Sequence, residues 1–226
     1  MDLFKKGMNR ATQAVGEAVG SAKKTEFSPE AVALLARADE IRHNTERLIQ
    51  ALQSYVQPDP TLSILPELTG EQPSKATVLS SRMSAFAGKL DEWKHDLAGA
   101  FGAAANAYDT IGHSEKATCQ QFSARTILPL KNVLKNEIRA LDEERNKLNN
   151  CRLDMDTVKN KKQPDANELE RLEKAFNDQQ DKVCKMIRDL EVKVTDYRSV
   201  LKALVEVDLL HYTTCVKALE EFSTKL

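Results

Sequence analysis

Apolar residues recur every three or four positions along most of the chain, which is the spacing of an amphipathic α-helix. In the first block, residues 1–24, this spacing is followed by Phe4, Met8, Val15 and Val19, and Leu3 precedes them. Three glycines weaken that helix, because each costs about 1 kcal/mol relative to alanine. We predict a segment that is disordered in water and becomes helical when a surface covers its apolar side.

Helix-start signals and prolines divide the remaining residues. Ser28 followed by Pro29 predicts an N-cap and a first turn, and the apolar pattern carries this helix to Pro58. The stretch 58–75 holds four prolines and is predicted to be an irregular insert. The insert is nevertheless apolar at four positions: Leu62, Ile64, Leu65 and Leu68.

Two further long helices follow the insert. Ser74 restarts a helix to about Leu97, and a join rich in glycine and alanine leads into a helical segment at about 103–162. Pro129 lies inside that segment and predicts a kink, because proline lacks a backbone donor. Asp165 then has the spacing of a capping box with Glu168, and an apolar stripe continues from there to the end of the chain.

The pattern therefore predicts an all-α fold, an elongated protomer of three long antiparallel coiled-coil helices spanning residues 25–226. The last helix has a wide apolar stripe whose phase shifts near Val205. One copy of the chain would leave much of the stripe exposed, so a dimer is the simplest way to cover it. The predicted dimer interface consists of Val194, Tyr197, Leu201, Leu204, Leu209, Tyr212 and Val216.

Composition narrows the kinds of partner. The 226 residues carry a net charge of only −1, basic positions are interleaved with acids, and no aromatic platform accompanies them, so we predict no nucleic-acid partner. The longest uncharged run, 97–108, is too short and too polar to cross a bilayer. The chain start lacks the apolar core of a signal peptide. We expect a cytoplasmic protein, with its four cysteines reduced.

Four short runs resemble the endophilin family in order and in spacing. Lys5-Lys6 with the run from Arg10 to Val15 resembles the amphipathic start of endophilins. Gln57-Pro58-Asp59-Pro60 resembles their break before the insert, and Pro129-Leu130-Lys131-Asn132 resembles their second-helix kink. Arg152-Leu153-Asp154-Met155-Asp156 resembles a run near the tip of each arm. The chain is identified on these runs as a relative of the endophilin N-BAR domain.

The resemblance implies a crescent-shaped antiparallel homodimer, or a heterodimer with a related protein, that binds anionic curved membrane peripherally. The implied activity is to sense or generate membrane curvature in tubule or vesicle formation, in endocytosis or organelle trafficking. Relatives usually carry a C-terminal Src-homology-3 domain. Proline-rich partners are therefore expected only if the protein continues beyond Leu226 with such a domain.

Two basic regions are candidates for lipid headgroups. The first block carries a net charge of +3 and holds Lys5, Lys6, Arg10, Lys23 and Lys24. The second region lies in the long middle helix and holds Arg139, Arg145, Arg152, Lys159, Lys161 and Lys162. From the residues alone, a solvated helix face is the favoured interpretation of the second region. The endophilin resemblance reverses this and favours lipid contact. The predicted membrane-inserting residues of the first block are Leu3, Phe4, Met8, Val15 and Val19. The insert cluster is open between a second membrane wedge and packing onto the dimer core.

The search for enzyme chemistry finds no active site. No phosphate-binding glycine loop, zinc-protease motif or activated nucleophile is recognisable, so we predict neither catalysis nor a cofactor. His211 and Cys215 lie four apart on one helical face, but two ligands do not make a metal site. The competing interpretation from another class is a coiled-coil scaffold or tether that never contacts lipid.

Overall fold

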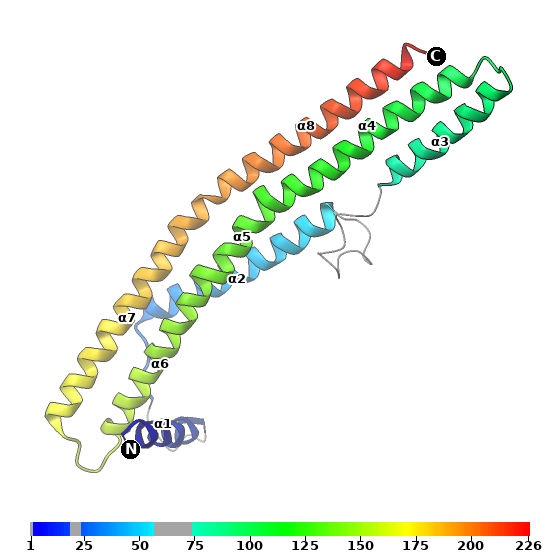
Figure 1. Cartoon of the computed structure of the whole chain (residues 1–226). Coiled ribbons are helices and arrows are strands. Elements are labelled where there is room, and N and C mark those ends of the chain that lie inside the picture. Colours follow the sequence, from blue (N-terminus) through cyan, green and yellow to red (C-terminus); the bar gives the residue numbers. More distant parts are fainter. Residues whose placement is uncertain (1, 19–23, 57–73) are drawn as a thin grey trace. The chain divides into compact units, whose positions relative to one another are not determined.

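The structure is a computed structural model of the chain, in which residues 2–18, 24–56 and 74–226 are described (Figure 1). These residues contain helices and turns and no strand, so the predicted all-α class is confirmed. They divide into two compact units, Met1–Glu46 with Asn132–Asp196 and Arg47–Lys131 with Tyr197–Leu226. The pairing of two copies into a crescent stays a prediction.

The first unit is built around α6 (Arg139–Lys159) and α7 (Ala166–Thr195), which lie side by side (Figure 1). The N-terminal part of α2 (Pro29–Val56) and the short α1 (Asp2–Ala18) complete the unit. Its core is a single cluster of buried apolar side chains: Ala38, Ile138, Leu141, Leu148, Met155, Phe176, Val183, Ile187 and Leu190. The stacked rings of Phe27 and Phe176, with centroids 6.0 Å apart, extend this core toward the N-terminal segment.

The second unit packs α4 (Ala98–Phe122) against α3 (Lys75–Glu92) and against α8 (Tyr197–Ser223) (Figure 1). Small residues let α3 and α4 approach closely, and the Ser80 hydroxyl donates to the Ala105 carbonyl oxygen at 2.7 Å. Phe122 of α4 and Val207 of α8 are fully buried. This unit also includes the C-terminal end of α2.

The predicted helix starts are confirmed. The Ser28 hydroxyl accepts from the backbone N–H of Ala31 at 3.2 Å, and Ser74 accepts from Thr77 at 3.1 Å. Asp165 accepts from two backbone N–H groups in the first turn of α7. Each side chain satisfies a donor that has no partner within the helix, which is why these positions begin helices.

The helix ends differ from the prediction at two places. The join after α3 lies at Trp93–Leu97 and not at the glycines, because Lys94 adopts a positive φ of 54° that ends the helix. Gly99 and Gly102 lie inside α4. The third long helix, predicted to continue from Asp165 to the end of the chain, is interrupted at Asp196, between α7 and α8.

Pro129 changes the helix type. It lies in α5 (Leu128–Asn132), between two π-helical turns, η1 (Ser123–Ile127) and η2 (Val133–Ile138). The Leu128 N–H donates to the Ser123 carbonyl five residues back, the wider hydrogen bond of a π turn. A proline ring crowds the preceding turn of a regular helix, and the wider turns relieve that crowding.

Candidate functional site

The N-terminal helix α1 presents an apolar side to solvent. Met8 is 60% exposed and Val15 is 63% exposed, and Ala11 between them is also exposed. Leu3 and Phe4 belong to the same helix, but their side chains, like those of Lys5 and Lys6, lie outside the described structure. Val19 and Lys23 lie outside the described residues.

The opposite, polar side of α1 packs against α6. Arg10 donates from Nε and Nη2 to the two carboxylate oxygens of Asp154, each at 2.7 Å. One and two turns further along, Gln13 is buried and Glu17 accepts from Gln13 Nε2 at 3.0 Å. The sequence predicts that this segment becomes helical when a surface covers its apolar side. In the structure the segment is helical with its polar side on α6 and its apolar side open.

A buried ion network lies beneath α1. Arg152 Nη1 donates to both carboxylate oxygens of Glu17 at 2.9 Å and to Asp156 Oδ2 at 3.1 Å. Asp156, only 1% exposed, also accepts from the backbone N–H and the hydroxyl of Thr25. Burial acts to raise the pKa of Glu17, but hydrogen bonds from Gln13 and Arg152 together lower that pKa below its ordinary value.

Arg152 is the clearest correction to the predicted headgroup-binding set. Its side chain is 5% exposed and is paired on both sides with carboxylates, so it does not face solvent. A helical wheel treats α6 as an isolated rod and cannot indicate that α1 will cover this position. The residues missed by the sequence prediction are the acceptors Glu17, Asp154 and Asp156. For the two aspartates, the available signal is the 152–156 run, in which Arg152, Asp154 and Asp156 alternate with the apolar residues Leu153 and Met155.

Arg145 and Arg10 are only partly accessible. Arg145 donates to both carboxylate oxygens of Asp39 on α2, at 2.5 and 3.1 Å. This hydrogen-bonded pairing raises the pKa of Arg145 and lowers the pKa of Asp39. Arg10 is similar, since the hydrogen bonds to Asp154 raise its pKa. Each guanidinium therefore keeps its charge but already has a carboxylate partner.

The other predicted cations are more accessible. Arg139 is 74% exposed and lies 3.6 Å from Glu143. Lys159 pairs with Glu173 at 3.0 Å and Lys161 with Glu168 at 3.6 Å, in both cases with more than a third of the lysine exposed. Lys24 and Lys162 are exposed. The structure thus brings the two predicted basic regions into one unit, with α1 packed on the helix that carries the second.

A second exposed apolar surface lies on α8. Six side chains, each between 42% and 62% exposed, form what we call the α8 stripe: Leu201, Val205, Leu209, Tyr212, Val216 and Leu219. At 100° per residue they fall within about 80° of one another. Of the predicted dimer residues outside this stripe, Val194, Tyr197 and Leu204 are half-buried, with Val194 in α7 of the first unit. The apolar insert residues Leu62, Ile64, Leu65 and Leu68 lie outside the described residues.

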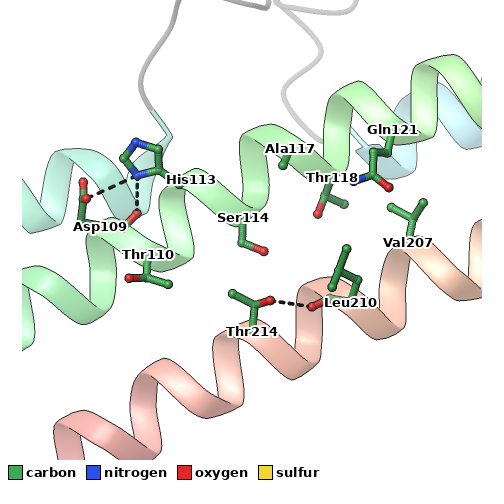
Figure 2. A pocket seen from close by; sticks show the side chains of 10 residues that line it. All are labelled: Asp109, Thr110, His113, Ser114, Ala117, Thr118, Gln121, Val207, Leu210 and Thr214. Carbon is green, nitrogen blue, oxygen red and sulfur yellow. Dashed lines mark hydrogen bonds and ion pairs between the residues drawn. The ribbon is translucent and has the colours of Figure 1, made fainter.

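A shallow hollow of about 410 Å³ lies between α4 and α8 in the second unit, lined by hydroxyl and apolar side chains (Figure 2). Ser114 on its wall contacts His211 Nδ1 at 2.9 Å, and His113 contacts Asp109 on the same helix. The wall is regular helix, whose backbone N–H groups are engaged four residues back and cannot stabilise an oxyanion. The Ser114–His211 hydrogen bond joins α4 to α8.

Cys215 Sγ lies 3.7 Å from His211 Nδ1, as their four-residue spacing predicts. Within the described ranges, no cluster of three or more metal-ligating side chains is found. All four cysteines are free, and burial raises the pKa of each thiol. None of the helices in the described part of the chain has an apolar stretch long enough to traverse a bilayer.

Comparison with known proteins finds a matching family and several relatives. A family model described as BAR domain matches residues 4–226, nearly the whole chain. Endophilin-B2 of Bos taurus is 29% identical over 157 residues, covering 66% of this chain and 40% of that protein. Endophilin-B1 of Gallus gallus is 24% identical over 97% of this chain and 64% of its own length. Endophilin-A1 of Mus musculus is 23% identical over 99% of this chain and 67% of its own length.

These matches confirm the resemblance found in the sequence. They also show that the aligned region spans only about two fifths of the Endophilin-B2 relatives, and about two thirds of the Endophilin-B1 and Endophilin-A1 relatives.

Proposed function

This chain belongs to the BAR domain family, and we propose that it binds anionic phospholipid as a dimer and bends the bilayer by inserting α1. Family membership supports a role in sensing or generating membrane curvature in general. The inserted helix, the headgroup contacts and the dimer are the finer parts of the proposal. It is a peripheral function, in which the protein approaches one leaflet from the aqueous side.

The observation that carries the proposal is the orientation of α1. Surface helices of globular proteins usually bury their apolar side against the core. In contrast, α1 buries Gln13 and exposes Met8 and Val15. An amphipathic helix whose apolar side remains open, beside lysines, has the character of an interfacial helix. Lipid covers such a side, and insertion into one leaflet separates the headgroups and favours positive curvature.

Electrostatics supports the same partner. Lys24, Lys162 and Arg139 are exposed, and each basic residue near an anionic leaflet contributes about 1 kcal/mol. Lys159 and Lys161 hold exposed surface pairs, which are worth little and can exchange a carboxylate for a phosphate. The headgroup contact is therefore assigned to these exposed residues, together with Lys5, Lys6 and Lys23, and not to Arg152.

The test is tubulation of anionic liposomes by the full chain and by variants. Removing residues 1–22 should preserve the oligomeric state and sharply reduce tubulation. A finer variant is Met8→Ser with Val15→Ser, which removes the exposed apolar side without changing charge. Val32→Ser with Val192→Ser is the matched control, because these valines are 52% and 67% exposed in the same unit but lie on other helices. Tubulation unchanged by both α1 variants would reject insertion.

The rival function is a coiled-coil scaffold for other proteins, which the exposed α8 stripe favours. Sedimentation with anionic vesicles at low and high salt separates the two functions. Lipid binding through exposed cations should weaken as salt rises, whereas a scaffold would remain in the supernatant at both salt concentrations.

A further inference from the structure

The 152–156 run of α6 holds the N-terminal segment at three separate points. Arg152 binds Glu17, Asp154 binds Arg10, and Asp156 binds Thr25. All three polar side chains of the run thus contact the first 25 residues of the chain. Asn160, one turn beyond, lies within 3.4 Å of Gln13 Oε1 and donates to it.

From these contacts we propose that Arg152, Asp154, Asp156 and Asn160 form a docking seat that fixes α1 as a helix before the protein meets a membrane. They are positioning residues, since they act on lipid only through the helix they hold. The inference extends the proposed function, because it concerns how the inserting helix is presented.

The seat is selective for one side of α1. Arg10, Gln13 and Glu17 are spaced three and four apart and therefore lie on one side of the helix. Met8 and Val15 lie about 180° away from that side. Docking by the polar side is consequently the same event as turning the apolar side outward.

The chemistry of the seat explains why a weak helix is formed. Short helices in water are marginal, and the glycines at positions 7 and 16 weaken this one further. Two parallel N–H···O bonds between Arg10 and Asp154 fix direction as well as distance. The buried guanidinium of Arg152 binds the Glu17 carboxylate. Without Glu17, part of the positive charge of Arg152 would be buried without a neutralising partner.

The seat also restricts motion after membrane contact. A helix joined to the body only by a flexible linker could insert at any angle. A helix held by ion pairs at Arg10 and at Glu17, nearly two turns apart, has a defined direction relative to α6. Bending force on the inserted helix is then transmitted to the helical unit.

The experiment is amide hydrogen exchange of residues 8–17 in the lipid-free full chain. Arg10→Asp and Asp154→Arg each place like charges at the Arg10–Asp154 contact, and the double charge swap restores opposite charges and the wild-type net charge. We expect exchange at least about tenfold faster in each single variant and slow exchange again in the double variant.

Matched controls separate undocking from the change of charge. Arg139→Asp and Glu143→Arg make the same charge changes on α6, at an exposed pair whose contact is within that helix. They should leave protection of residues 8–17 unchanged. Fast exchange in the wild-type chain, or no gain of protection in the double swap, would overturn the docking seat.

The readout stands apart from the test of insertion. Hydrogen exchange is measured without lipid, so a docked α1 that fails to tubulate vesicles would reject insertion and leave the seat intact. Conversely, an undocked wild-type α1 that tubulates normally would reject the seat and leave insertion intact. With phosphatidylserine vesicles, the single variant Asp154→Arg should bind but tubulate less, since it adds positive charge and loses orientation.

Discussion

At the scale of single residues, Gly112 lies where α4 packs tightly against the start of α3. A Cβ built there would lie 2.2 Å from Thr77 Oγ1, 2.8 Å from Ser74 Oγ and 2.9 Å from the Thr77 backbone nitrogen. The backbone nitrogen cannot rotate away, and the Ser74 hydroxyl is the N-cap of α3. We predict that Gly112→Ala lowers the free energy of unfolding by roughly 1–3 kcal/mol through overpacking, measured by urea denaturation.

The matched control is Gly102→Ala in the same helix. No heavy atom lies within 4 Å of a Cβ at that position. Alanine is favoured over glycine by about 1 kcal/mol in a helix interior, so Gly102→Ala should stabilise the protein. If both substitutions stabilised equally, the close packing of α3 and α4 would be contradicted.

The partners of charged residues were the least predictable feature at this scale. The sequence identified Arg10, Arg145 and Arg152 as basic side chains on a helix surface, which is correct as local chemistry. Asp154 and Asp39, which bind the first two, come from positions 144 and 106 residues away in the chain. A periodicity argument ranks positions around one helix and carries no information on which other helix will cover them.

At the scale of elements, helix starts were predictable and helix ends were less so. Ser28, Ser74 and Asp165 begin helices because each supplies an acceptor for unpaired N–H groups, a local property of sequence. Lys94 ends α3 in a left-handed conformation that glycine or asparagine usually adopts, so no residue type signalled the end. The π turns around Pro129 likewise reflect the accommodation of one ring, for which only a kink could be foreseen.

The contact between α6 and α7 contains a buried carboxylate that makes stability depend on pH. Hydrogen bonds from Lys147, Lys182 and Gln179 lower the pKa of Glu144 from 4.5 to about 2. A depressed pKa stabilises the fold above pH 4.5, and this stabilisation is lost as pH falls toward 2. We predict that Glu144→Gln lowers the thermal midpoint by roughly 5 °C at pH 7 and has a smaller effect near pH 3.

Glu143→Gln provides the comparison for that series. Its carboxylate is 63% exposed and lies 3.6 Å from Arg139, an exposed contact within one helix. Exposed pairs of this kind contribute about 0–1 kcal/mol, so its thermal midpoint should follow that of the wild type at both pH values. A Glu144→Gln deficit that stayed constant from pH 7 to pH 3 would exclude the carboxylate network as its cause.

At the scale of the whole molecule, the class and the family were accessible from sequence and the site was accessible only in part. Helical periodicity and proline positions are properties of the local sequence. They predicted the all-α class, and the endophilin-like runs indicated the family. The local sequence of α1 does not determine which of its sides is covered. In the structure the polar side is covered, and Glu17 of α1 pairs with Arg152, which also pairs with Asp156. These contacts depend on how α1 and α6 pack together, which the sequence of either helix alone does not reveal.

The α8 stripe carries the last prediction, which concerns the number of copies in solution. Six half-exposed apolar side chains within about 80° of one helix face are more than a single soluble copy ordinarily leaves open. We expect the protein to sediment at twice its 25.3 kDa mass, and Leu209→Glu to shift it to the mass of one chain, because a carboxylate would be buried without a partner. Lys217→Ala makes the same change of net charge on the other side of α8 and should leave the mass unchanged. A wild-type chain that sediments as a monomer at tens of micromolar would leave the stripe to another partner, and would remove the doubled lipid-binding surface that the proposed function requires.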